Sequence, residues 1–201
     1  MNCGIVIIPT YNEIENIESI VRAVFSLHKS FHILIVDDNS PDKTADKVKE
    51  LQKEFSDKLF LEQRDKKAGL GTAYVHGFKW ALAKQYEFVF EMDADFSHNP
   101  LDLDRLLAAC ENGADVAIGS RYVKGGDTEN WPLDRLIYSK GGSLYTRIIT
   151  GMPVKDPTAG FMCYKHKVLA SMQLDNIKFI GYAFQIEMKF AARKLGFTIK
   201  E

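Results

Sequence analysis

Short apolar runs alternate along the chain with longer stretches in which apolar residues recur every three or four positions. The runs predict strands, at residues 5–8, 33–36, 59–61, 88–92, 116–119 and 161–164. The periodic stretches predict helices, over residues 14–25, 45–55, 72–84, 133–150 and 185–195, with a further helix opening at residues 99–100. Uninterrupted runs rich in β-branched residues are typical of strands buried on both faces. The alternation therefore predicts an α/β fold, a mostly parallel sheet with helices on both faces.

Two of the predicted helices carry starting signals. Asn12 is followed three residues later by Glu15, and this pair resembles a capping box. Asn99 precedes Pro100, which suits an N-cap followed by a proline in the first turn. We therefore expect the first helix to begin just after Asn12, and another to begin just after Asn99.

Length and composition are those of one globular domain. The chain has 201 residues, of which 46% are apolar and 26% charged, so a single domain over residues 1–201 can build a sizeable core. Residues 197–201 look like a strand that stops partway, and we expect the C-terminal end of this domain to be truncated. The net charge of −1 gives no reason to expect nucleic acid as a partner.

Polar clusters follow four of the predicted strands, at residues 9–13, 37–42, 93–97 and 120–121. The carboxyl ends of parallel strands lie at one edge of a sheet, where open α/β sheets bind ligands. Asp93 and Asp95, one residue apart after the run 88–92, suit a hard divalent cation and, through it, a diphosphate. The alternative is a polar turn after a buried strand.

The carboxylates at this edge would repel a bare phosphate. Either a cation lies between them and the phosphate, or they bind the non-phosphate end of the ligand. A nucleotide meets both demands. Asp38 can accept hydrogen bonds from a base or ribose, while Asp95 and a metal hold the diphosphate. For Asp37, Asp38 and Asp42 the alternative role is capping of the next helix and compensation of its dipole.

Three arginines are candidates for holding a phosphate that no metal covers, because a guanidinium is a fixed, planar donor fork. Arg121 is the main candidate, since it follows a strand at the expected edge. Arg135 and Arg147 lie on the predicted helix 133–150, where surface charge or pairing with acids is the alternative.

Several common motifs are missing from the sequence. Gly69-Leu70-Gly71 lacks the third glycine of a dinucleotide fingerprint, because position 74 is Tyr74. There is no P-loop and no histidine pair with metal spacing, and the three cysteines have no zinc spacing, which fits reduced thiols in the cytosol. No apolar stretch reaches the roughly 18–20 residues that span a bilayer.

Five segments of the chain, in this order, resemble those of the family 2 glycosyltransferases, and more narrowly those of the dolichol-phosphate (polyprenyl-phosphate) mannosyltransferase branch. They are residues 9–13 (PTYNE), 36–42 (VDDNSPD), 69–71 (GLG), 92–95 (MDAD) and 119–122 (GSRY). The resemblance continues through Trp131, Arg135 and Ser139 to residues 156–161 (DPTAGF) and 181–187 (GYAFQIE). It covers nearly the whole chain.

The resemblance implies a Rossmann-like GT-A fold and a metal-dependent, inverting transfer from a nucleotide sugar, usually GDP-mannose. The acceptor would be a polyprenyl phosphate, so the enzyme would be peripheral at the cytoplasmic face of a membrane, with any anchoring segment or partner outside this chain. By position, the contacts to the nucleotide sugar fall on Pro9, Tyr11, Glu13, Val36, Asp38, Asp93, Ala94, Asp95 and Arg121. Asp93 and Asp95 would hold Mg²⁺ or Mn²⁺, and Asp95, Arg121 and Arg135 would act in catalysis.

The sequence departs from the family at two places. Some relatives carry a glutamine two residues after the second aspartate as a further metal ligand, and this position is Ser97 here. The family also continues past residue 201 with a basic loop that covers the nucleotide. Metal choice and donor affinity are the properties that these departures affect.

Other functions remain as alternatives. The nearest alternative is a family 2 enzyme that uses a UDP-sugar. It would be either a glucosyl-phosphopolyprenol synthase or a polysaccharide transferase with a general base near Asp95. A sugar-phosphate nucleotidyltransferase would need a glycine- and arginine-rich loop after the first strand, and residues 9–13 are not such a loop. A nucleotide-binding regulator without activity would not need Asp93, Asp95 and Arg121.

Overall fold

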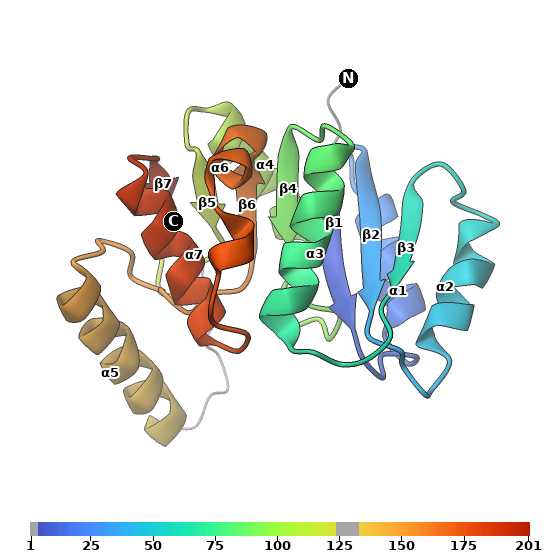
Figure 1. Cartoon of the computed structure of the whole chain (residues 1–201), viewed down its shortest axis with the longest axis horizontal. Helices are drawn as coiled ribbons and strands as arrows, with labels where there is room; N and C mark the ends of the chain where they lie inside the picture. The colour runs from blue at the N-terminus through green and yellow to red at the C-terminus, as the bar shows by residue number, and fades with distance from the viewer. Residues whose placement is uncertain (1–3, 124–132) are drawn as a thin grey trace.

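The computed structural model of the chain describes residues 4–123 and 133–201, and the side chains of 4–123 and 138–201. Within these residues a seven-stranded sheet has the order β3-β2-β1-β4-β6-β5-β7 (Figure 1). The strands are β1 (Gly4–Thr10), β2 (Phe31–Asp37), β3 (Leu59–Gln63), β4 (Phe88–Glu91), β5 (Val116–Ile118), β6 (Met162–Lys165) and β7 (Ile199–Lys200). The predicted α/β sheet is confirmed.

Helices cover both faces of the sheet, as predicted. The helices are α1 (Ile17–Phe25), α2 (Thr44–Gln52), α3 (Leu70–Ala83), α4 (Leu103–Glu111), α5 (Leu133–Thr150), α6 (His166–Ser171) and α7 (Ala183–Lys194), with short 3₁₀ helices η1 (Pro100–Asp102) and η2 (Leu174–Asn176). Alternate residues of β1 point to opposite faces. Val6 and Ile8 pack with α1, α2 and α4, whereas Ile5 and Ile7 pack with α3, α6 and α7. Helix α5 stands apart from the sheet in Figure 1.

Strand direction decides which loops meet. β1 is parallel to β2 and β4, β2 to β3, and β5 to β7, whereas β6 runs antiparallel between β4 and β5. The carboxyl ends of β1, β2, β4 and β5 therefore share one edge with the amino end of β6. The strand order reverses between β1 and β4, and such switch points form the ligand crevices of open α/β sheets.

The prediction for the start of the first helix was wrong, and the one for Asn99 is confirmed. Helix α1 begins at Ile17, and Asn12 has a left-handed backbone with φ of 62° instead of the extended backbone of an N-cap. The reason lies in the next loop, because the Asn12 amide donates to Ser40 Oγ at 3.1 Å. The Asn99 side chain accepts from the Leu101 amide at 3.1 Å and opens η1 with Pro100 in its first turn.

Candidate functional site

The loops after β1 and β2 are joined to each other by side-chain hydrogen bonds. Asp37 is fully buried and accepts from Thr10 Oγ1 at 2.9 Å and from Ser40 Oγ at 2.6 Å. Asp42 accepts from the Ile14 amide at 3.0 Å and from the Thr44 amide at 2.9 Å, at the start of α2. Asp42 thus bonds to the first residue of α2, in line with the capping role that the sequence left open for it, whereas Asp37 holds the loops after β1 and β2 together.

Asp38 has an intramolecular partner that the sequence interpretation missed. Arg64 donates to Asp38 through Nε at 2.6 Å and Nη2 at 2.7 Å, and through Nη1 to Thr72 Oγ1 at 2.9 Å. Arg64 follows β3 directly, so its place after a predicted strand was a signal that could have found it. Asp38 Oδ2 also accepts from the Ala68 amide at 3.3 Å, whereas one hydrogen bond, from Arg64, is described at Oδ1, which can accept another. A contact from Asp38 to a base or ribose stays a prediction.

Asp93 lies just past the end of β4, and two side chains from other positions hold it. Its Oδ1 accepts from Tyr74 Oη, on α3, at 2.8 Å, and its backbone amide donates to His98 Nδ1 at 3.1 Å. Burial lowers the pKa of His98, so the neutral ring, which has a nitrogen free to accept, is favoured. Burial raises the pKa of Tyr74, which keeps its hydroxyl as a donor to the carboxylate.

Asp95 is the exposed member of the pair. Burial alone would raise the pKa of its carboxyl, but hydrogen bonds from the side chain and backbone of Ser97 outweigh that effect and lower the pKa below its usual value. The Ser97 amide donates to Asp95 Oδ1 at 3.0 Å. Ser97 therefore supports the ionised form of Asp95 in this structure.

The donor set of Asp93 and Asp95 fits a divalent cation that is shared with a substrate. In the described part of the chain, no group of three or more histidine, cysteine, aspartate or glutamate side chains is placed to hold a metal ion by itself. Mg²⁺ binds proteins through one or two carboxylates and takes its other oxygens from phosphates and water. Two carboxylates at the edge where a diphosphate is expected match that requirement, and the role of Asp93 and Asp95 as ligands stays a prediction.

Arg121 follows β5 and reaches Asp156, which precedes β6. Its Nε and Nη2 donate to the two carboxylate oxygens at 2.7 and 2.6 Å, and Nη2 also donates to Thr158 Oγ1 at 2.9 Å. The hydrogen bonds to Asp156 raise the pKa of Arg121. Burial opposes ionisation of Asp156, but Arg121 outweighs it and lowers the pKa of that carboxyl. The sequence placed Arg121 at this edge but did not find its partner.

The loop 156–161 brings the Arg121 pair against the turn that carries Asp93. A methyl group at Gly160 would lie 3.6 Å from His98 Cε1 and 3.9 Å from Asp93 Oδ2. The rings of Phe161 and His98 stack, with their centroids 5.0 Å apart. Because β6 is antiparallel, this loop enters the sheet at the edge where β4 and β5 end. Arg121, the candidate for binding a phosphate, and Asp93, the candidate metal ligand, therefore lie close together.

The other predicted contacts differ in what they can offer. Tyr11 is exposed, with Lys67 Nζ 4.1 Å from the centroid of its ring. Val36 and Ala94 are buried in the two cores, so their side chains are turned away from a ligand and only their backbone could contact one. Pro9 is half-buried and pairs in register with Val36.

Glu13 is half-buried and accepts from Asn16 Nδ2 at 3.0 Å. Arg135 belongs to α5, but its side chain lies outside those that the structure describes. Arg147 is exposed in the last turn of the same helix. Tyr122 Oη and Ser139 Oγ, 2.6 Å apart, connect the residue after Arg121 to α5.

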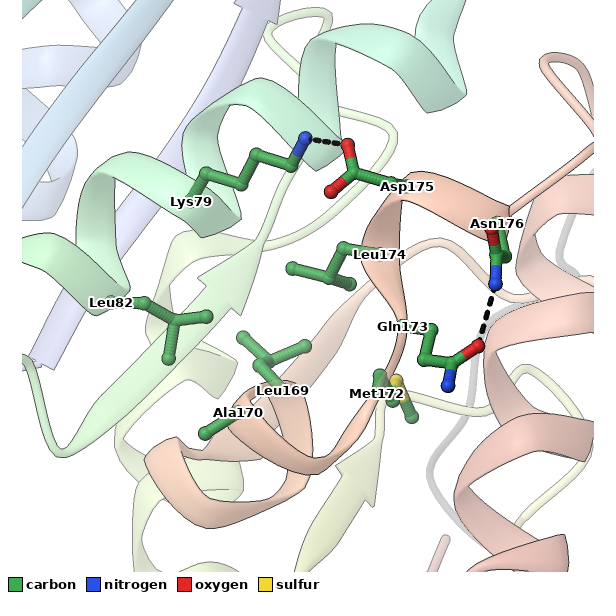
Figure 2. A pocket seen from close by; sticks show the side chains of 9 residues that line it. All are labelled: Lys79, Leu82, Leu169, Ala170, Met172, Gln173, Leu174, Asp175 and Asn176. Atoms are coloured by element: carbon green, nitrogen blue, oxygen red, sulfur yellow. Dashed lines mark hydrogen bonds and ion pairs between the residues drawn. The ribbon is translucent and has the colours of Figure 1, made fainter.

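Two pockets on the surface differ in their distance from the predicted site residues. One, of about 540 Å³, lies between the loops after β1 and β2 and is lined by residues that include Asn12, Glu15 and Asp42. The other, of about 390 Å³, lies among α3, α6 and η2 (Figure 2). Lys79 and Asp175 form an ion pair at its side. The first pocket adjoins the predicted nucleotide contacts, and none of the predicted site residues lines the second.

Comparison with known proteins identifies the family. Residues 5–172 match Glycosyl transferase family 2. The chain is 46% identical over 197 residues to polyprenol monophosphomannose synthase of Mycolicibacterium smegmatis, an alignment that covers 98% of this chain and 74% of that protein. It is 43% identical over 195 residues to undecaprenyl-phosphate mannosyltransferase of Micrococcus luteus, over 97% of this chain and 79% of that one.

The fold has solved counterparts. Glucosyl-3-phosphoglycerate synthase of Mycobacterium tuberculosis, in a complex with Mn²⁺, UDP and glucosyl-3-phosphoglycerate, superposes with a TM-score of 0.65 at 17% identity, over 99% of this chain and 70% of that one. At this identity the similarity concerns the fold, and it confirms the predicted GT-A type. The chain belongs to glycosyltransferase family 2 and is a glycosyltransferase that resembles the polyprenyl-phosphate mannosyltransferases.

Proposed function

We propose that this chain transfers a mannosyl residue from GDP-mannose to a polyprenyl phosphate of the dolichyl type, with inversion at the sugar and with Mg²⁺ or Mn²⁺ bound. The observation that carries the proposal is that Arg121, held by Asp156, and the turn that contains Asp93 and Asp95 lie on the two sides of the loop 156–161, where Gly160 is next to Asp93. The relatives that transfer mannose to polyprenyl phosphates support the choice of sugar and acceptor.

The chemistry needs little from the protein beyond placement and charge. The bound metal would neutralise the diphosphate as it leaves. Tyr74 holds the Asp93 carboxylate in one direction, and Ser97 keeps Asp95 ionised. A phosphate oxygen of the acceptor attacks the anomeric carbon as the bond to the diphosphate breaks, so the configuration inverts. The acceptor is already an anion and needs no general base, while Arg121 supplies positive charge beside it.

Helix α5 offers a surface for the lipid part of the acceptor. Its exposed large apolar side chains are Tyr138, Leu144, Tyr145, Ile148 and Ile149. Clustered apolar and aromatic side chains on a helix with polar positions suit the interface of a bilayer. No helix within residues 4–123 and 133–201 is both long and apolar enough to cross a membrane. We propose a peripheral enzyme at the cytoplasmic face, with α5 on the lipid side and one GT-A domain over residues 1–201.

The test combines binding and transfer. We would titrate GDP and UDP calorimetrically with and without Mn²⁺, and measure transfer of labelled mannose from GDP-mannose to a polyprenyl phosphate in detergent. We expect GDP binding that requires the metal and is lost in Asp95→Asn, whereas Asp57→Asn, an exposed residue before β3, binds as the wild type does. Preference for UDP would overturn the choice of donor and favour a UDP-sugar transferase on the same fold.

A further inference from the structure

Lys189 on α7 is completely buried, with none of its side chain exposed to solvent. A lysine is almost never fully buried unless its ammonium has partners, because removing a charge from water is costly. Its Nζ donates to the backbone carbonyl of Ala159 at 2.6 Å and to that of Gln185, one turn earlier on α7, at 3.2 Å. The contact with Ala159 joins α7 to the loop 156–161.

Two buried acids, Glu91 and Asp156, attract the charge of Lys189. Glu91, the last residue of β4, is also fully buried and accepts from Gln185 Nε2. Burial raises the pKa of Glu91, and burial lowers the pKa of Lys189, whereas the attraction between Lys189 and the carboxylates of Glu91 and Asp156 opposes both effects. One of these acids, Asp156, is the partner of Arg121, so the charge of Lys189 is linked to the candidate site.

The loop that Lys189 holds controls both halves of the candidate site. At one end Asp156 fixes the guanidinium of Arg121 and also accepts from the Arg121 backbone amide at 3.1 Å. At the other end Gly160 and Phe161 pack against the turn that carries Asp93, through His98. Ala159, whose carbonyl accepts the hydrogen bond from the Lys189 ammonium, lies between these two ends.

We propose that Lys189 is a positioning residue of the transferase, whose ammonium fixes Ala159 and thereby sets Arg121 relative to Asp93. Its kinetic part rests on the proposed function. Asp93 has an independent support in Tyr74, whereas Arg121 depends on Asp156 in the same loop. Loss of the ammonium therefore reduces turnover more than it reduces affinity for the nucleotide.

The central variant is Lys189→Met, which keeps the length and apolar stem but removes the donor. A displacement of about 1 Å in an active site can lower the rate by about 100-fold, so we expect kcat to fall by about 10- to 100-fold, with the KM for GDP-mannose within about twofold of the wild type. The matched control is Lys194→Met on the same helix, an exposed lysine that should leave both constants unchanged. In Lys189→Gln the amide keeps a donor without a buried charge, and we expect an intermediate kcat. This variant replaces Lys189→Met if the latter does not fold.

Hydrogen exchange gives a readout that does not depend on catalysis. The Arg121 amide donates to Asp156 Oδ2, and the Ala159 amide donates to the Asp156 carbonyl at 3.3 Å. We expect both amides to exchange faster in Lys189→Met or Lys189→Gln than in Lys194→Met, with β1 and β2 unchanged.

The outcomes separate the two proposals. Unchanged exchange at Arg121 and Ala159 would overturn the positioning role, and so would faster exchange with an unchanged kcat per folded molecule in an active enzyme. If the two amides exchange faster in the Lys189 variants but the wild type transfers no mannose, the positioning of Arg121 is supported and only the proposed function is contradicted.

Discussion

Arg121 and Asp156 are 35 residues apart in sequence and form a two-pronged ion pair, with N–O distances of 2.7 and 2.6 Å. The two ends of the pair differ in their surroundings, since the side chain of Asp156 is fully buried and that of Arg121 is 29% exposed. Removing one partner of such a pair is therefore not equivalent to removing the other.

The first prediction is an asymmetry in stability between Arg121→Met and Asp156→Asn. Arg121→Met leaves a buried, unpaired carboxylate, and we expect the free energy of unfolding to fall by about 3 kcal/mol. Asp156→Asn leaves an arginine that can reach solvent, and we expect a loss of about 1 kcal/mol. Urea denaturation of both variants checks this order. Equal losses, or the reverse order, would show that the exposure of Arg121 does not relieve its unpaired charge.

The second prediction concerns acid. Because the pKa of Asp156 is lower in the folded chain than its ordinary value, its ion pair stabilises the fold above that ordinary value, and this stabilisation is lost as the pH falls through the folded pKa. We expect the urea midpoint of the wild type to fall steeply below about pH 4, and that of Asp156→Asn to fall less. A parallel decline in both proteins would assign acid sensitivity to other carboxylates.

The third prediction is that Tyr74→Phe weakens metal binding. The variant removes the hydroxyl that donates to Asp93 Oδ1 at 2.8 Å and keeps the ring that stacks on Phe184. Groups that orient a metal ligand are worth about 10- to 100-fold in affinity, and we expect a loss of about tenfold in Mn²⁺-dependent GDP binding by calorimetry. Tyr86→Phe is the matched control, because Tyr86 bonds to His32 instead. If both variants bind alike, Tyr74 does not orient Asp93.

The sequence predicted the edge of the site better than its interior. The strands ending before Glu13, Asp38 and Asp93 could be read from apolar runs, since a strand buried on both faces leaves a plain signal. Helix α5 was predicted over 133–150 and has those bounds. Such patterns report burial and periodicity, which are local properties of the chain.

The sequence could not show the direction of each strand or which residues far apart in the chain form pairs. Nothing in residues 161–164 says that β6 runs antiparallel, yet this direction brings Asp156 to Arg121 and Gly160 to Asp93. The capping signal at Asn12 failed for a similar reason, because Ser40 from another loop took its backbone amide. Partners far apart in sequence are fixed by topology, and a single sequence does not show topology.

The fourth prediction tests how closely α3 must approach β1. A methyl group at Gly77 would lie 2.6 Å from Ile7 Cγ2, which is shorter than any ordinary contact, so either the helix or the Ile7 side chain must move in Gly77→Ala. Overpacking of this kind costs about 1–3 kcal/mol, and we expect that loss in the free energy of unfolding by urea. Gly142→Ala is the matched control, since Gly142 is also in a helix and has open space around it, where alanine favours the helix by about 1 kcal/mol.

The same variant also tests the link between packing and the metal site. Tyr74 lies one turn before Gly77, on the same buried face of α3, and donates to Asp93. A helix displaced from β1 carries the Tyr74 hydroxyl with it, so Gly77→Ala should weaken Mn²⁺-dependent GDP binding as Tyr74→Phe does, while Gly142→Ala leaves it unchanged. A Gly77→Ala protein with normal binding but reduced stability would mean that Asp93 keeps its position when α3 moves, and the support of Asp93 would then come from His98 and the loop 156–161.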